Sequence, residues 1–309
     1  MNNFKENIEQ YIDFAQKNGA SQTQLSLLYS DDFSVTIRNG EIEEFNKSIS
    51  NVLTLKINVN DRIASASTSD LRPATINKLI LSTIQRAMHS EPDPFARLAD
   101  FVTNDFDLEK LQIFDPDIEK ISIDEKIHKA KELEKICLSE PRIALSDGSF
   151  FSTSLSKAFV GNSNGFLAGF DSSSVAAGIH LHTHDDENSY EDGWYDNSVF
   201  YSDLMDIEQI AQTAIHRSTR LLGARKIKSQ TLDVIFEPSV ASSIFGMLAA
   251  CLSGGLIYMN RSCLAGKLHQ KIAVDNLTIN DIPNIPKGIG SIPFDADCLP
   301  VLPLNILEN

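Results

Sequence analysis

The sequence is poor in cysteine, and its first residues lack the apolar core of a secretion signal. Its 309 residues include four cysteines, none of them in a C-x-x-C pair. So few thiols favour free cysteines in a reducing compartment over a disulfide framework. The first ten residues are polar and contain no apolar signal core. We therefore expect a cytoplasmic protein.

Positive charge is also scarce. The chain has 27 Lys and Arg against 42 Asp and Glu, a net charge of −15. Eleven acids and three bases lie within 91–125, and ten acids but no Lys or Arg lie within 158–216. Such surfaces repel phosphates. We expect no nucleic-acid partner.

One uncharged stretch, 239–260, is 22 residues long, enough to cross a bilayer. Serine and glycine dilute it, and Gly254-Gly255 interrupts it. We interpret it as a buried helix that runs into a strand, and we expect no membrane association.

Hydrophobic periodicity predicts an α+β fold. An amphipathic helix ends near Gly19, strand patterns follow it, and a second helix covers 74–88. Asn39-Gly40 is typical of a type I′ hairpin turn because both residues tolerate positive φ, and Asn60-Asp61 marks another turn. The pattern predicts an antiparallel meander with flanking helices, with strands over 24–29, 33–38, 41–46, 52–59 and 62–67.

The rest of the chain alternates between irregular, helical and β-rich regions. The acidic segment 91–125 contains three prolines and no sustained periodicity, which predicts an extended connection. Ser122 to Glu125 fits a capping box and predicts a helix to about Leu138. The later predicted elements are a β-rich region to about Thr183, a helix that starts at Asp203 or Asp206, a strand over 232–237 and a helix capped by Ser239.

Three histidines alternate along one predicted strand, at His180, His182 and His184. Alternate strand residues face the same way, so these imidazoles suggest a metal site. Successive members lie about 6–7 Å apart, so two can share an ion, whereas the outermost pair requires a bulge. Two hypotheses remain: a metal-dependent hydrolase that uses these histidines, and an exposed strand that ends in an acidic loop.

Other motifs have a structural interpretation. Gly161-Asn-Ser163-Asn-Gly165 matches the G-x-S-x-G nucleophile elbow, but that motif requires a helix after the serine and a strand pattern follows instead. We interpret it as a hairpin turn. Ser154-Leu-Ser-Lys157 fits S-x-x-K and lacks a following helix too. We predict no catalytic residue in this chain.

A basic cluster follows the predicted helix that starts at Asp203 or Asp206. Cations at the C-terminal end of a helix interact favourably with its dipole. They could equally contact an acidic surface of a partner subunit. The cluster consists of Arg217, Arg220, Arg225, Lys226 and Lys228.

Short motifs in a fixed order occur along the whole chain. They are Arg38-Asn-Gly40-Glu41, Ala64-Ser-Ala-Ser-Thr-Ser-Asp70-Leu71, Pro92-Asp-Pro94, Leu98-Ala-Asp100, Asp147-Gly148-Ser149-Phe150, Gly161 to Gly165, Leu222-Gly-Ala-Arg225-Lys226, Val234-Ile235-Phe236, Ser253-Gly254-Gly255 and Gly290-Ser291-Ile-Pro293-Phe294-Asp295. Together they resemble the TldD/PmbA proteins, the modulators of DNA gyrase that are also classed as peptidases.

The resemblance implies that this chain lacks the metal-binding motif that one branch of the family carries. The TldD branch carries a metal-binding His-Glu-x-x-x-His on the helix after the Val-Ile-Phe strand. Here that helix, Val240 to Leu252, contains no His, Asp or Glu. The chain therefore resembles the PmbA (TldE) branch, the accessory subunit of a cytosolic metallopeptidase that trims unfolded or leader peptides. A zinc-bearing TldD-like subunit, or a homodimer, is the implied partner, and no cofactor is expected in this chain.

The resemblance also implies three domains. They are an N-terminal α+β domain with its acidic connection (1–115), a β-rich middle α+β domain (116–225) and the start of a β-rich C-terminal domain (226–309). Family members continue beyond Pro293-Phe294-Asp295, which implies that most of the last domain is missing here.

A further hypothesis is a non-catalytic acidic module that binds a protein such as gyrase.

Overall fold

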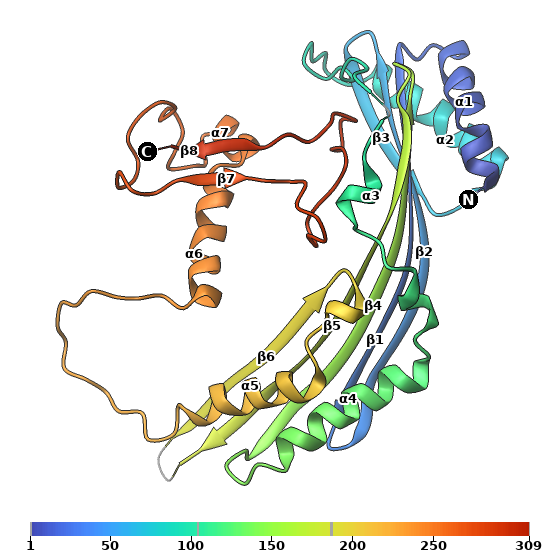
Figure 1. The fold of residues 1–309 in the computed structure, drawn as a ribbon. Helices are drawn as coiled ribbons and strands as arrows, with labels where there is room; N and C mark the ends of the chain where they lie inside the picture. The colour runs from blue at the N-terminus through green and yellow to red at the C-terminus, as the bar shows by residue number, and fades with distance from the viewer. Residues whose placement is uncertain (1, 104, 186–187, 309) are drawn as a thin grey trace. The chain divides into compact units, whose positions relative to one another are not determined.

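The structure is a computed structural model that describes residues 2–103, 105–185 and 188–308. The chain divides into two compact units, Met1–Gly223 with Ile282–Pro303, and Ala224–Asp281 with Leu304–Asn309. A six-stranded antiparallel sheet of order β3-β2-β1-β4-β5-β6 forms the first unit (Figure 1). Its strands are β1 (Gln22–Arg38), β2 (Glu41–Val59), β3 (Arg62–Thr68), β4 (Leu145–Asn162), β5 (Leu167–His184) and β6 (Ser189–Ser198).

Tight turns join the long strands, as the sequence predicts. Asn39 and Gly40 have φ of 54° and 78°, and Asn60 and Asp61 have φ of 51° and 62°. The G-x-S-x-G segment is the turn between β4 and β5, so the prediction of a hairpin there is confirmed.

The strands are longer than their hydrophobic patterns predict. Segments 24–29 and 33–38 belong to one strand, β1, although Ser30-Asp31-Asp32 separates them. These three polar residues pair with β2 on one side and β4 on the other. Main-chain hydrogen bonds from two neighbours therefore keep the strand continuous where side-chain hydrophobicity is lost.

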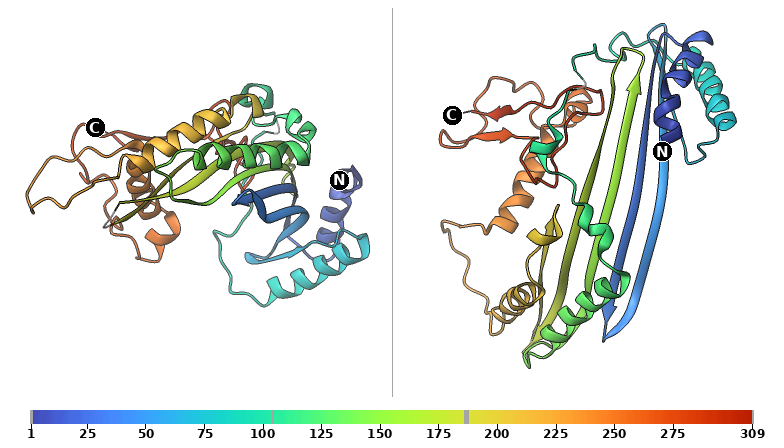
Figure 2. Two further views of the ribbon diagram at one scale, coloured as in Figure 1. Left: turned by 90° about the horizontal axis from the view of Figure 1, so that it is seen from below. Right: turned by 45° about the vertical axis from the view of Figure 1, so that its right-hand side comes forward.

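Four helices cover one face of the sheet. Helices α1 (Asn2–Lys17) and α2 (Pro73–Met88) form one core with the first part of β1 and the facing residues of β2. Helices α4 (Ile123–Leu138) and α5 (Ile207–Thr219) form a second core with the last part of β1 and with β4 and β5. Figure 2 shows α4 and α5 side by side across the strands. Alternate residues of β1 point into these two cores: Leu25, Leu27, Phe33, Val35 and Ile37 are each at most 2% exposed.

The helix starts follow from capping residues. Ser122 accepts a hydrogen bond from the backbone N–H of Glu125 at 3.1 Å, as the predicted cap of α4. Asp206 caps α5 by accepting from the N–H of Glu208 at 2.9 Å. The preceding acidic segment is largely irregular, and its described residues between α2 and α4 form only the short helices α3 (Leu108–Leu111) and η1 (Pro116–Lys120).

The opposite face of the sheet carries small hydroxyl side chains. They are half-exposed or exposed, and part of this face forms a hollow of about 220 Å³. At one end the face is covered by an aromatic cluster around Phe166, Phe294 and Cys298. By register, the polar face comprises Ser30, Asp32, Ser34, Asn46, Ser48, Ser50, Ser152, Ser154, Ser156, Ser172 and Ser174.

The second unit contains helices α6 (Pro238–Cys251) and α7 (Gly254–Tyr258) and a two-stranded sheet of β7 (Ile279–Asp281) and β8 (Leu304–Leu307). The predicted helix is confirmed, but its cap is not Ser239: the helix begins at Pro238 and Glu237 is the N-cap residue. None of the helix residues is buried, and a short helix rather than a strand follows. Residues 232–237 form no strand, since no described segment pairs with them.

Candidate metal centre

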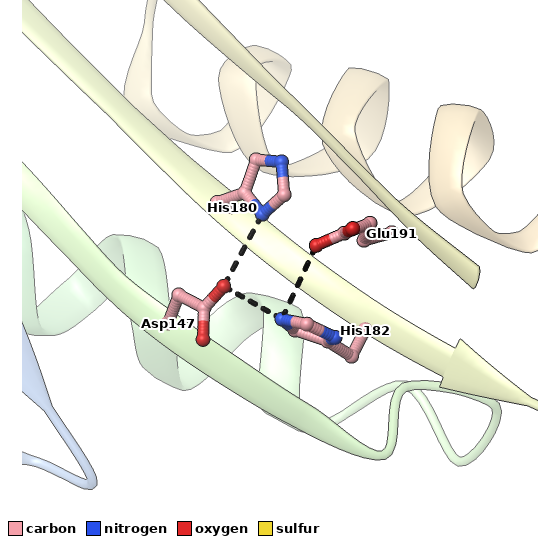
Figure 3. Close-up of side chains that lie close together, drawn as sticks. All are labelled: Asp147, His180, His182 and Glu191. Atoms are coloured by element: carbon pink, nitrogen blue, oxygen red, sulfur yellow. Dashed lines mark hydrogen bonds and ion pairs between the residues drawn. The ribbon is translucent and has the colours of Figure 1, made fainter. Parts of the chain in front are cut away.

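The sheet places four potential metal ligands together where β4, β5 and β6 run side by side (Figure 3). A bulge in β4 makes this arrangement, because Ser146 pairs with Leu181 and Gly148 pairs with His180, which leaves Asp147 as an extra residue. Gly148 adopts a φ of +120°, which favours glycine. The bulge therefore directs the Asp147 carboxylate towards the histidines of β5.

The other ligands follow from strand register. His180 and His182 lie on the same face of β5, and Glu191 of β6 pairs directly with His182. Oδ2 of Asp147 lies 2.6 Å from Nε2 of His182 and 3.4 Å from Nδ1 of His180. Oε2 of Glu191 lies 4.0 Å from Nε2 of His182. One ligand atom from each of the four residues lies within 4.8 Å of the others.

The local charges keep Asp147 ionised. Its hydrogen bond with His182 lowers the pKa of the Asp147 carboxyl below its ordinary value, and His180 contributes in the same direction. Nη2 of Arg38 lies 3.6 Å from the other carboxylate oxygen, Oδ1. Oδ2 of the Asp147 carboxylate therefore faces the two imidazoles, while Arg38 contacts the other carboxylate oxygen, Oδ1.

The sequence placed two of these four residues. His180 and His182 are brought together as alternate strand positions, whereas the third predicted ligand, His184, pairs with Ser189 outside the group. Asp147 and Glu191 were missed. Their only local signal is the Asp147-Gly148 pair, which is as typical of an ordinary turn as of a bulge.

The other predicted motifs have structural roles. Ser163 accepts a hydrogen bond from the N–H of Thr23 at 3.0 Å, within the β4–β5 turn. Ser154 donates to Oδ1 of Asp32 at 2.5 Å. Its S-x-x-K partner, Lys157, pairs with Asp171 at 3.7 Å. These contacts account for both motifs without a nucleophile.

Part of the predicted basic cluster contacts the acidic strand β6. Arg217 and Arg220 approach the Asp192 carboxylate at 3.2 and 3.7 Å. The guanidinium of Arg217 also lies 5.2 Å from the ring centre of Trp194. These two arginines therefore neutralise charge within their own unit.

Helix α6 cannot hold the metal that the family resemblance associates with this position. Its 14 residues include no His, Asp or Glu, and its single thiol, Cys251, has Cys263 beside it but belongs to no group of three or more potential ligands among the described residues. Zinc requires several such donors in one place. The residues present do not fit a catalytic metal on this helix.

Comparison with known proteins gives consistent matches along the chain. Models of the PmbA/TldA metallopeptidase match as domain 1 at 24–90, as the central domain at 116–222 and as the C-terminal domain at 229–309. The metalloprotease PmbA of Escherichia coli O157:H7 is 30% identical over 265 residues, which cover 85% of this chain and 58% of that protein. A PmbA homologue of Haemophilus influenzae is 27% identical over 96% of this chain and 66% of its own length.

Solved structures match the fold. A proposed modulator of DNA gyrase from Bacteroides thetaiotaomicron has a TM-score of 0.90 at 25% identity, covering all of this chain and 70% of that one. TldE from Thermococcus kodakarensis has a TM-score of 0.79 at 19% identity, covering 97% of this chain and 67% of that one. The chain thus spans less than two thirds of the curated proteins named above.

Proposed function

The chain belongs to the PmbA/TldD metallopeptidase family, and we propose that within this family it acts as a PmbA-type subunit without a catalytic metal of its own. The observation that carries this proposal is the composition of α6 (Pro238–Cys251), which has no His, Asp or Glu to activate water and offers only one thiol, Cys251, as a potential zinc ligand. The name PmbA of its curated relatives supports the same branch.

The implied assembly pairs this chain with a TldD-like subunit that carries the zinc. In that assembly the catalytic metal and base come from the partner, and this chain completes the space in which the peptide lies. Unfolded or leader peptides in the cytoplasm are the proposed substrates. Modulation of DNA gyrase belongs to the names of structural relatives and forms no part of this proposal.

The hydroxyl-lined face of the sheet supports a role in peptide binding. Ser34, Ser152, Ser154 and Ser174 line the hollow on this face, together with Asp32. Hydroxyl groups donate and accept hydrogen bonds, so they can contact a peptide backbone whatever its side chains. A surface of this kind suits a subunit that holds varied unfolded peptides.

Complex formation tests the proposal. The chain and a TldD-like subunit are mixed and separated by size-exclusion chromatography, and a stable complex that cleaves an unfolded peptide is the expected result. Replacing Ser152 and Ser174 with alanine in this chain should raise KM for the peptide and leave kcat unchanged. No complex, or a complex whose kinetics do not differ from those of the partner alone, contradicts the proposal.

The gyrase-binding alternative predicts a different outcome. A non-catalytic acidic module would bind its protein target in a salt-sensitive manner, because exposed charges are screened by added salt. It would not change peptide cleavage by the partner. A pull-down at two salt concentrations distinguishes the two proposals.

A further inference from the structure

The cluster of Asp147, His180, His182 and Glu191 has the composition of a transition-metal site. Two imidazole nitrogens and two carboxylate oxygens suit Zn²⁺, whereas Mg²⁺ and Ca²⁺ favour sites made only of oxygen. We propose that these four residues bind one Zn²⁺ and that the ion fastens the edge strand β6 to β5 and β4. This site is separate from the catalytic metal of the proposed assembly and does not depend on it.

The distances lie on both sides of the value that zinc requires. With bonds of about 2.0–2.1 Å, the ligand atoms of a tetrahedral site lie about 3.3 Å apart. Here the separations are 2.6 Å, 3.4 Å and 4.0 Å for the three contacts in Figure 3, and no pair in the group exceeds 4.8 Å. The side chains of Glu191 and His180 are 66% and 50% exposed, so they can rotate to close the longer separations.

The contacts of Asp147 favour binding of the ion through one carboxylate oxygen, Oδ2. Oδ2 of Asp147 faces both histidines, while Oδ1 faces Arg38. A carboxylate that binds zinc through one oxygen is commonly held by a partner on its other oxygen. Arg38 can serve as that outer partner and orient Asp147, so its positive charge supports the ligand rather than occupying the position of the ion.

Gly193 leaves room for the site. It pairs with His180 across the β5–β6 ladder, and a Cβ added to it would collide with the carbonyl oxygen of Ile179 and lie 3.2 Å from Cδ2 of His180. Glycine at this position therefore lets β6 approach closely and leaves the His180 ring in place. The cluster is thus supported by two backbone features, this close approach and the Asp147 bulge.

The proposed ion has a structural role. Its four protein ligands fill a tetrahedral shell, as in structural zinc sites, whereas catalytic sites keep one position for water. The ligands come from three neighbouring strands. Since β6 is the edge of the sheet and pairs only with β5 among the described strands, a metal link to β4 and β5 would protect it from fraying.

Titration of the untagged, metal-free chain with Zn²⁺ tests the proposal. Isothermal calorimetry should give one ion per chain, and Zn²⁺ should raise the thermal midpoint of unfolding. His182→Gln should weaken binding about tenfold or more, because even the loss of an outer-shell partner costs about 10–100-fold. His184→Gln is the matched control, since it changes a histidine on the same strand outside the group.

A second set of variants tests whether cysteine thiols hold the ion instead. The thiols Cys251 and Cys263 interact with each other and are the alternative zinc ligands. If the four-residue site holds the ion, the double variant Cys251→Ser with Cys263→Ser should still bind one Zn²⁺ per chain. Circular dichroism of each metal-free variant verifies folding. The proposal is overturned if His182→Gln binds as tightly as wild type, if His184→Gln weakens binding equally, or if the serine variants abolish it.

Discussion

Replacing Glu134 with glutamine tests whether helix α4 holds the β1–β2 turn. Glu134 is 1% exposed and accepts hydrogen bonds from the backbone N–H groups of Asn39 at 3.0 Å and Gly40 at 2.8 Å. A carboxylate accepts through both oxygens, whereas a glutamine amide presents one oxygen and one NH₂ group. The substitution keeps the side-chain volume, so the packing around it is preserved. One of the two turn N–H groups, however, then faces the NH₂ group of the glutamine, which is a donor and cannot accept its hydrogen bond.

The expected cost follows from these two contacts. A hydrogen bond to a charged group contributes about 1.5–3 kcal/mol, and a neutral one about 1 kcal/mol. Glu134→Gln loses one charged bond and converts the other into a neutral bond, while water can still reach the exposed turn. We expect a loss of about 2–4 kcal/mol in the free energy of unfolding. For a unit of this size, that corresponds to a fall of about 5–15 °C in Tm.

Urea unfolding followed by circular dichroism measures this loss. Glu132→Gln is the control, because Glu132 lies on the same helix with a side chain that is 42% exposed and only surface ion pairs with His128 and Lys129. It should change stability by less than about 0.5 kcal/mol. If Glu134→Gln lowers the free energy of unfolding no more than Glu132→Gln does, Glu134 does not anchor the turn.

Three further predictions concern the packing of the first unit. Gly193→Ala should weaken Zn²⁺ binding and destabilise the chain by about 1–3 kcal/mol, because its Cβ meets the neighbouring backbone. Gly290→Ala is the control, since its Cβ would meet nothing within 4 Å and should change neither quantity. Calorimetry measures the binding and urea unfolding measures the stability. Burial lowers the pKa of Lys126 below its ordinary value, so just below about pH 10 the unfolded chain binds a proton that the folded chain has released and stability rises with pH. Urea unfolding across this range should show the rise in wild type and not in Lys126→Met; equal slopes would contradict it. Burial also raises the pKa of the Cys137 thiol to about 12, so iodoacetamide at neutral pH should label the exposed Cys263 first and Cys137 only after unfolding, as mass spectrometry of the peptides can show.

The parts of the fold that local chemistry determines were predictable. Asn39-Gly40 tolerates positive φ, and Ser122 can cap a helix, so the first hairpin and α4 follow from a few adjacent residues. The continuity of β1 across Ser30-Asp31-Asp32 was not predictable, because it depends on main-chain bonds to two strands distant in sequence. A hydrophobic pattern reports burial of side chains and carries no information on such partners.

The candidate metal site also contains residues that the sequence predicted and residues that it missed. Alternation along a strand placed His180 and His182 on one face. Asp147 joins them through a bulge, and Glu191 joins them through the β5–β6 register. Both depend on how whole strands align, and register is determined by the packing of the buried face rather than by the ligands themselves. For this reason the sequence suggested His184 as a ligand and missed the two carboxylates.

One cleavage assay tests whether this chain contributes to a peptidase without a catalytic metal of its own. An unfolded peptide is incubated with this chain alone, with a TldD-like subunit alone, and with both, each with and without a zinc chelator. Cleavage should appear in the mixture, should be lost with the chelator, and should be absent from this chain alone. Chelator-sensitive cleavage by this chain alone would show that the chain holds a catalytic metal of its own.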